Sequence, residues 1–246
     1  MTSAHDATAR RDELSTSLAK VHARVAQACR ATGRRLDDIR LIVVTKYFPD
    51  TDIKLLCQLG VTDIGESRDQ EASAKIAALP QEVRQRLQVH FIGQLQSNKA
   101  GSLAAYADTV HSIDRDKLVL ALDRAATAAG RDIGVLVQVS LSAGPNSRGG
   151  AARGGIPRDG VAALANSVAA AQHLRLRGLM AVAPLGVDPG EAFAQLATVA
   201  RDLRAEHPGA TWISAGMSAD LESAVANGAT HLRVGSAILG SRPPLG

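Results

Sequence analysis

The stretch LIVVTKYFPD, residues 41–50, places four apolar residues and a threonine directly before a lysine. An unbroken apolar run of this length is typical of a strand that is buried on both faces. A charge at the end of such a strand is costly unless it reaches water, is paired, or is used in chemistry. Lys46 is therefore either a side chain that snorkels or pairs, or a functional one.

Further β-rich runs follow, and they alternate with alanine-rich stretches that have a helical pattern. The predicted strands are Leu41–Thr45, Thr62–Ile64, Val89–Ile92, Thr109–Ile113, Val135–Leu141, Leu176–Ala181, Thr211–Ser214 and His231–Val234. The predicted helices between them include Asp50–Leu59, Arg68–Ala78, Arg115–Ala129, Arg158–Ala171, Gly190–Glu206 and Ala219–Asn227. Several of these helices are followed by glycine, which commonly ends a helix.

Strict alternation of strand and helix implies parallel strands joined by right-handed crossovers. Eight such units in 246 residues predict an α/β fold, a single (β/α)8 TIM barrel that spans residues 1–246 as one domain. Apolar residues spaced by three and four over residues 12–32 predict an additional N-terminal helix. An open doubly wound sheet is the alternative, but no glycine fingerprint follows Thr45.

Composition narrows the function classes. The formal charge of +4 comes from 28 basic and 24 acidic residues that are scattered along the chain, and only three Phe, two Tyr and one Trp could stack on bases. We therefore expect no nucleic-acid partner.

Two cysteines without metal-ligand spacing predict reduced thiols and no metal site. The polar N-terminus and the lack of a long apolar run predict a cytoplasmic protein that does not contact a membrane.

Reactive residues of a parallel barrel lie at the carboxyl ends of its strands. The chain has six lysines, at positions 20, 46, 54, 75, 99 and 117, and only Lys46 ends a buried strand. The other five lie in or beside helical patterns that predict solvent exposure. Desolvation at the end of a strand can lower the pKa of a lysine, which frees the amine to condense with an aldehyde.

Two loops near the C-terminus are suited to phosphate. WISAGMSADLE, residues 212–222, places Ser218 where a helix N-cap is expected, although any capped helix has a similar pattern. LRVGSAILG, residues 232–240, follows the last strand with Gly235 and Ser236. Barrels often bind phosphate with the loops after their last two strands. With Arg233 between the loops, the pattern indicates an aldehyde-bearing phosphate ester, of which pyridoxal 5'-phosphate is the obvious example. The glycine-rich segment Ser142–Pro157 lacks a nucleotide-binding ending and predicts a flexible loop.

The motifs of the chain resemble those of the pyridoxal phosphate homeostasis proteins, a family related in fold to the barrel domain of alanine racemase. They are VVTKYFP (43–49), GESRDQE (65–71), HFIGQLQSNK (90–99), HSID (111–114), LVQVS (136–140), LRGLMAV (176–182), SAGMSADLE (214–222) and LRVGSAILGSR (232–242). The resemblance implies that Lys46 carries the cofactor as a Schiff base. It implies a cofactor-binding set of Lys46, Ser67, Ser214, Met217, Ser218, Arg233, Gly235 and Ser236.

Within that set, the resemblance implies that Ser218, Gly235 and Ser236 hold the phosphate and that Arg233 reaches the pyridine nitrogen. The chain departs from the family pattern at two positions: Ser67 stands where the family commonly has asparagine, and Gln94 where it often has histidine. The blocks that contain them, Glu66–Gln70 and Gln94–Lys99, are expected to border the cofactor.

An arginine at the pyridine nitrogen disfavours the protonated ring that carbanion chemistry uses. A two-base racemase also needs a second proton-transfer group, and the chain has only Tyr47 and Tyr106. Tyr47 follows Lys46 directly, so in an extended chain it should point away. We also expect the chain not to contain the extra β-domain of the racemases. These features favour a binding protein that carries and buffers pyridoxal phosphate over a pyridoxal phosphate-dependent racemase. We expect no catalytic residues, a monomer, and transient contact with pyridoxal phosphate-dependent apoenzymes.

Overall fold

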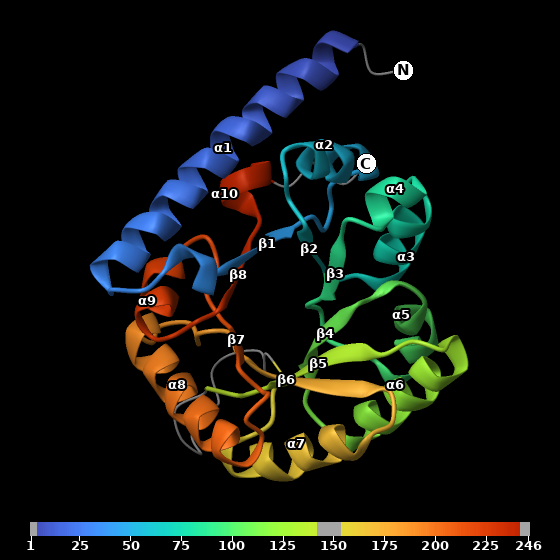
Figure 1. Ribbon diagram of the computed structural model, residues 1–246, viewed down its shortest axis with the longest axis vertical. Helices are drawn as coiled ribbons and strands as arrows, with labels where there is room; N and C mark the ends of the chain where they lie inside the picture. Colours follow the sequence, from blue (N-terminus) through green and yellow to red (C-terminus); the bar gives the residue numbers. More distant parts are fainter. Residues whose placement is uncertain (1–3, 142–153, 242–246) are drawn as a thin grey trace.

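The computed structural model describes residues 4–141 and 154–241, which form a closed barrel of parallel strands surrounded by helices (Figure 1). Strands β1 to β8 are Arg40–Val44, Asp63–Glu66, Gln88–Phe91, Thr109–Ile113, Ile133–Gln138, Leu174–Met180, Trp212–Ser214 and His231–Val234. Each strand pairs with the next in sequence, and β8 closes the barrel against β1, where Leu41 lies opposite Leu232. The predicted (β/α)8 fold is confirmed, with every predicted strand end within three residues of the observed one.

Helices connect the strands and cover the outside of the barrel (Figure 1). They are α1 (Ala4–Ala31), α2 (Asp50–Gln58), α3 (Asp69–Ala77), α4 (Gln81–Arg84), α5 (Ala100–Tyr106), α6 (Asp116–Ala129), α7 (Val161–Ala170), α8 (Pro189–Glu206), α9 (Leu221–Ala226) and α10 (Ser236–Leu239). Short 3-10 turns occupy Leu36–Asp38, Ser97–Lys99 and Arg158–Gly160. The sequence pattern did not predict α4, α5 and α10, because one or two helical turns are too short to show a period.

Helix α1 lies along the outside of the barrel beside α9 and α10 (Figure 1). Its buried stripe consists of Leu14, Leu18, Val21, Val25 and Cys29, as the apolar spacing predicted. The helix begins before residue 12, however, because its first turns are held by charge rather than by apolar contact. There Arg10 donates to Asp52 of α2 and to the backbone oxygen of Leu239.

The interior of the barrel is polar at its centre, where most such barrels have branched aliphatic layers. Three histidines from β3, β4 and β8 are buried: His90, His111 and His231. Between ring centroids, His111 lies 5.1 Å and His231 lies 6.4 Å from His90. Asp63 and Arg233 are buried in the same interior. Hydrogen bonds link His90 to His111 and to Asp63, as buried polar groups generally require, whereas Nε2 of His231 has no hydrogen-bond partner among the described residues.

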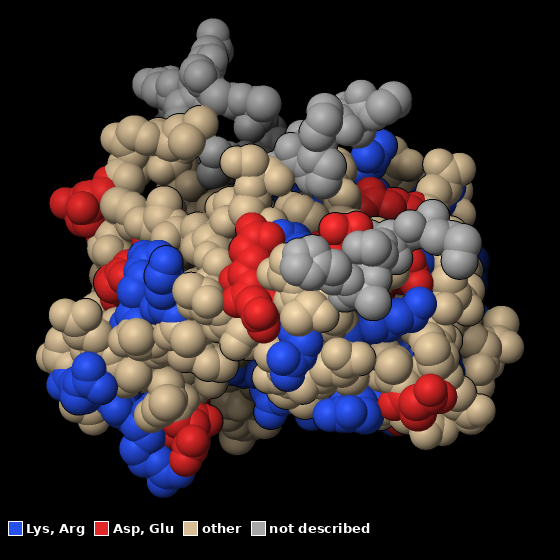
Figure 2. Space-filling view, turned by 90° about the horizontal axis from the view of Figure 1, so that it is seen from above, with Lys and Arg blue, Asp and Glu red and all other residues tan. Residues whose placement is uncertain are grey.

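Acidic and basic side chains are interspersed on the face shown in Figure 2. Cys29 and Cys57 are both free and buried. Within residues 4–141 and 154–241, no helix combines the length and apolar character needed to cross a bilayer. Most of the predicted flexible segment Ser142–Pro157 lies outside the described residues.

Candidate functional site

A cavity of about 470 Å³ opens at the carboxyl ends of β1 and β8, where parallel barrels place their reactive groups. Its polar lining consists of Lys46, Tyr47, Ser218, Arg233 and Ser236, and its apolar lining includes Val44, Phe48, Ile92 and Met217. Two cations contribute to this lining, and no carboxylate among the described residues does. The cavity is therefore suited to a small anionic ligand with an apolar ring, and its volume is in the usual range for such sites.

Lys46 follows β1 by two residues and is half-buried at the mouth of the barrel. The chain turns sharply here, because Tyr47 adopts a left-handed conformation with φ +71°. The Lys46 amine consequently lies 5.8 Å from the centroid of the Tyr47 ring. The expectation that Tyr47 points away from Lys46 is wrong, since it assumed an extended chain, and Tyr47 lines the same cavity.

The loops after β7 and β8 meet at the cavity, as the barrel geometry predicted. Ser236 donates to the hydroxyl oxygen of Ser218 over 3.3 Å, and the Ala237 amide lies 3.4 Å from the same oxygen. Ser218 therefore does not cap its own helix, which was the predicted role. Helix α9 begins later, at Leu221, with Asp220 at its N-cap position. The Asp220 side chain accepts from the Met217 amide in the preceding loop.

Gly235 directly precedes α10, and the first amides of any helix have no acceptor within it. Gly216 shapes the other loop: its φ is +90°, and a Cβ there would lie 2.5 Å from the Cβ of Ala224. Its carbonyl accepts from the Arg233 amide, which ties the two loops together. The backbone thus turns Met217 and Ser218 toward the cavity.

Arg233 lies on β8 with 4% of its surface exposed, and its guanidinium is fixed by two acceptors. It donates to the hydroxyl of Ser214 over 2.7 Å and to the backbone oxygen of Ala181 over 2.9 Å. Burial lowers the pKa of Arg233 to about 10, so it stays protonated at neutral pH. Ser214 does not line the cavity; it supports Arg233 from behind.

The support of Arg233 continues through the barrel interior. Since a guanidinium only donates, Ser214 accepts from Arg233, and its hydroxyl donates to Nδ1 of His111 over 2.9 Å. Burial keeps the pKa of His111 well below its ordinary value, so the neutral ring carries its proton on Nε2 and donates to His90 Nδ1 over 2.9 Å. His90 Nε2 then donates to Asp63 over 2.9 Å.

Ser67 and Gln94 border a different cavity, of about 770 Å³, between the loops after β2 and β3. Its lining carries charges of both signs, from Arg68, Asp69, Glu71 and Lys99. The structure therefore does not bring Ser67 into the cavity that Lys46, Met217, Ser218, Arg233, Gly235 and Ser236 line. The strand-end rule placed these residues on one rim of the barrel but could not separate the two cavities on it.

Lys75 is a second lysine near Lys46, and the sequence pattern did not reveal it. Its side chain is only 5% exposed, whereas it was expected to face solvent. The ammonium lies 2.8 Å from Glu66, which is completely buried at the end of β2. A usable signal was present, because Lys75 lies between Ala72 and Ile76 on the buried stripe of α3.

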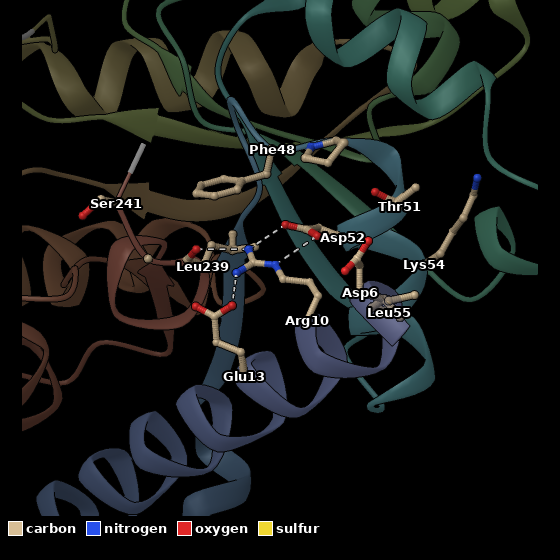
Figure 3. Close-up of a pocket in the computed structure, with 13 residues that line it drawn as sticks. Asp6, Arg10, Glu13, Phe48, Thr51, Asp52, Lys54, Leu55, Leu239 and Ser241 are labelled. Carbon is tan, nitrogen blue, oxygen red and sulfur yellow. Dashed lines mark hydrogen bonds and ion pairs between the residues drawn. The ribbon is translucent and has the colours of Figure 1, made fainter. Parts of the chain in front are cut away.

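A third cavity, of about 680 Å³, lies outside the barrel between α1, α2 and α10 (Figure 3). Arg10 points into its centre, but Asp52 and Glu13 pair with this guanidinium over 2.7 Å each. Figure 3 shows all three acceptors around Arg10, including the backbone oxygen of Leu239. Arg10 is thus already neutralised, and Lys54, the other cation of this lining, pairs with Asp50 over 2.6 Å. The Lys46 cavity is therefore the better anion site.

Comparison with known proteins gives consistent similarities. The family model for the alanine racemase N-terminal domain matches residues 23–243. The pyridoxal phosphate homeostasis protein of Mycobacterium tuberculosis (strain ATCC 25618 / H37Rv) is 44% identical over 249 residues, covering 95% of this chain and 94% of that protein. The protein of the same name from Escherichia coli (strain K12) is 35% identical over 234 residues, covering 94% and 97%. The structure of PipY of Synechococcus elongatus PCC7942 with pyridoxal phosphate bound has a TM-score of 0.77 and 32% identity, covering 92% and 100%.

Proposed function

Because the chain belongs to the family of pyridoxal phosphate homeostasis proteins, we propose that it binds pyridoxal 5'-phosphate in the cavity lined by Lys46 and Arg233, and carries and buffers this cofactor. The observation that carries the proposal is the donor set of that cavity. An amine, a guanidinium, two serine hydroxyls and the phenol of Tyr47 line it, with no opposing carboxylate among the described residues. We also propose that the protein acts as a cytoplasmic monomer that hands the cofactor to apoenzymes.

Each group has a distinct task in this proposal. When bound, pyridoxal phosphate supplies an aldehyde that reacts with amines and a ring that withdraws electrons. Lys46 would hold the cofactor as a Schiff base, while Ser218, Ser236 and the amides at Gly235 and the start of α10 would hold the phosphate. Arg233 would face the ring nitrogen, and Met217 would contact the ring. Ser214 would act only through Arg233. Ser67 would border the bound cofactor from the side of the neighbouring cavity that it lines.

The charge state of Arg233 favours binding over turnover. A protonated guanidinium beside the ring nitrogen opposes a second proton there, which weakens the ring as an electron sink. Arg233 is held in this state by the hydroxyl of Ser214 and the backbone oxygen of Ala181. A carrier benefits, because a cofactor that is a poor electron sink causes few side reactions.

One observation keeps an amino-acid racemase as the second candidate. Tyr47 lines the same cavity as Lys46, so its phenol is a candidate for the second proton-transfer group. Tyr106 is not, since it is buried on α5, donates to Asp69, and does not line the cavity. Burial raises the pKa of Tyr106, which further reduces its use as a base.

The two functions are separated by incubating the cofactor-loaded protein with a panel of single-enantiomer amino acids. A carrier shows no sustained loss of chirality or transamination, but transfers its cofactor to an added apoenzyme and restores that enzyme's activity. Sustained turnover that Lys46→Ala abolishes would replace the carrier proposal with the racemase, and Tyr47→Phe would then show whether the phenol takes part.

A further inference from the structure

We propose that Lys75, Glu66 and Glu71 form a clamp that fixes the backbone on both sides of Lys46 and thereby positions its amine in the cavity. This proposal rests on the proposed function only for the identity of the ligand that the Lys46 amine binds. These three residues come from the end of β2 and from α3, far in sequence from the loops after β7 and β8 that complete the cavity. They are positioning residues, because none of them lines the Lys46 cavity.

Lys75 is the centre of the clamp, and its ammonium has three acceptors. It lies 2.9 Å from the backbone oxygen of Thr45, 2.8 Å from Glu66 Oε1 and 3.1 Å from Glu71 Oε1. A lysine ammonium has three protons, so this set satisfies it completely. A lysine so engaged cannot move without breaking contacts to the chain next to Lys46.

The same two carboxylates hold the residues that flank Lys46. The Thr45 hydroxyl donates to Glu66 Oε1 over 2.7 Å, on one side of Lys46. The Tyr47 amide donates to Glu71 Oε1 over 2.5 Å, on the other side. Each carboxylate oxygen thus accepts both from Lys75 and from a neighbour of Lys46. The Phe48 amide closes the turn onto the Thr45 oxygen.

The conformation of Tyr47 explains why such a clamp is needed. A non-glycine residue with φ +71° occupies a sparsely populated region and stays there only when its surroundings impose it. The bond from its amide to Glu71 is positioned to do so. Without the clamp, the turn can relax toward an extended chain, which would swing the Lys46 side chain relative to Arg233.

Burial makes Lys75 indispensable to the arrangement. Glu66 is fully buried, and within the described part of the chain its second oxygen, Oε2, has no hydrogen-bond partner. Removal of Lys75 would leave that carboxylate unpaired in the barrel wall, which is strongly unfavourable. Lys75→Met alone can therefore fail to fold, whereas Glu66→Gln with Lys75→Met removes the charge together with the clamp. Glu71→Ala is milder, since Glu71 is only partly buried.

The clamp is tested first on the cofactor-free protein by amide hydrogen exchange at Tyr47. We expect exchange at least about tenfold faster in Glu71→Ala, which removes the acceptor of the amide, and in the Glu66→Gln, Lys75→Met double variant, which removes the lysine that orders this acceptor. Glu71→Gln should restore slow exchange, since its amide oxygen still accepts. The matched control is Lys54→Met, which also removes a lysine from an i,i+4 ion pair, with Asp50. Tyr47 exchange that is unchanged in both clamp variants would overturn the proposal.

The second arm measures the dissociation constant for pyridoxal phosphate by its absorbance. We expect about a tenfold rise in Glu71→Ala and a wild-type value in Glu71→Gln and Lys54→Met. If exchange accelerates but wild-type protein does not bind the cofactor, the proposed function fails and the clamp stands. If wild type and Glu71→Ala bind equally well, the clamp does not position Lys46 for this ligand.

Discussion

Mild acid is expected to destabilise the barrel through its interior histidines. Burial lowers the pKa of His231 to about 3, from an ordinary value of 6.5, and lowers that of His111 well below 6.5. The unfolded chain therefore binds protons at these rings below about pH 6.5, whereas the folded chain does not. The free energy of unfolding falls as the pH falls through this window, and rises again with pH.

The magnitude follows from linkage. For His231, the loss between neutral pH and pH 5 amounts to about 2 kcal/mol, and it grows by about 1.4 kcal/mol for each further pH unit until the folded-state pKa is approached. His111 adds a loss of the same sign. Because domains are stable by only about 5–15 kcal/mol, the loss from both rings is a large part of the total. Burial raises the pKa of Glu66, which offsets some of this loss at lower pH.

The assay is urea unfolding, followed by far-UV circular dichroism, at half-unit steps between pH 7.5 and pH 4.5. His231→Phe provides the matched variant. It keeps a ring on Trp212, 4.1 Å away between centroids, and removes a nitrogen, Nε2, that has no partner among the described residues. The variant also loses the hydrogen bond between Nδ1 of His231 and the Thr230 hydroxyl.

We expect the variant to lose stability with acid less steeply than wild type, by about 1.4 kcal/mol per pH unit below pH 6. If the free energy of unfolding of the two proteins falls in parallel with pH, His231 does not cause the acid sensitivity. A wild-type stability that is constant from pH 7 to pH 5 would equally show that these histidines are not neutral in the folded state.

The remaining predictions concern the cavity. Lys46→Ala should keep the fold, judged by circular dichroism and a melting temperature near that of wild type, but should not develop the yellow absorbance of bound cofactor. Arg233→Ala should alter that absorbance, weaken cofactor retention in dialysis, and lower the free energy of unfolding by about 1–3 kcal/mol, because Ser214 loses its donor. Ser236→Ala should raise the dissociation constant about fivefold while leaving the absorbance maximum unchanged, since a hydroxyl to the phosphate is lost; a shifted maximum would place Ser236 at the ring instead.

The fold and the cavity rim could be predicted from sequence because both depend on local patterns. Apolar runs indicated the strands, and the rule that reactive groups follow parallel strands indicated Lys46, Ser218, Arg233 and Ser236. Each of these residues lies within a few positions of a strand end, so small errors in the bounds did not matter. The same rule could not assign Ser67 to a different cavity from Lys46, because the division between the two cavities depends on how neighbouring loops pack.

Two features required the structure because they depend on residues distant in sequence. The left-handed Tyr47 is held by Glu71, which is 24 positions away. Lys75 is buried only because Glu66 and the Thr45 oxygen meet it inside the barrel wall. Charges of this kind are exposed in most helices, so the pattern alone favoured solvent.

Borohydride reduction of the protein mixed with pyridoxal phosphate, followed by peptide mass mapping, shows which lysine holds the cofactor. We expect the added cofactor mass on the peptide that contains Lys46 and on no other lysine peptide. Modification of Lys75 or of any other lysine in place of Lys46, or no modification at all, would contradict this expectation.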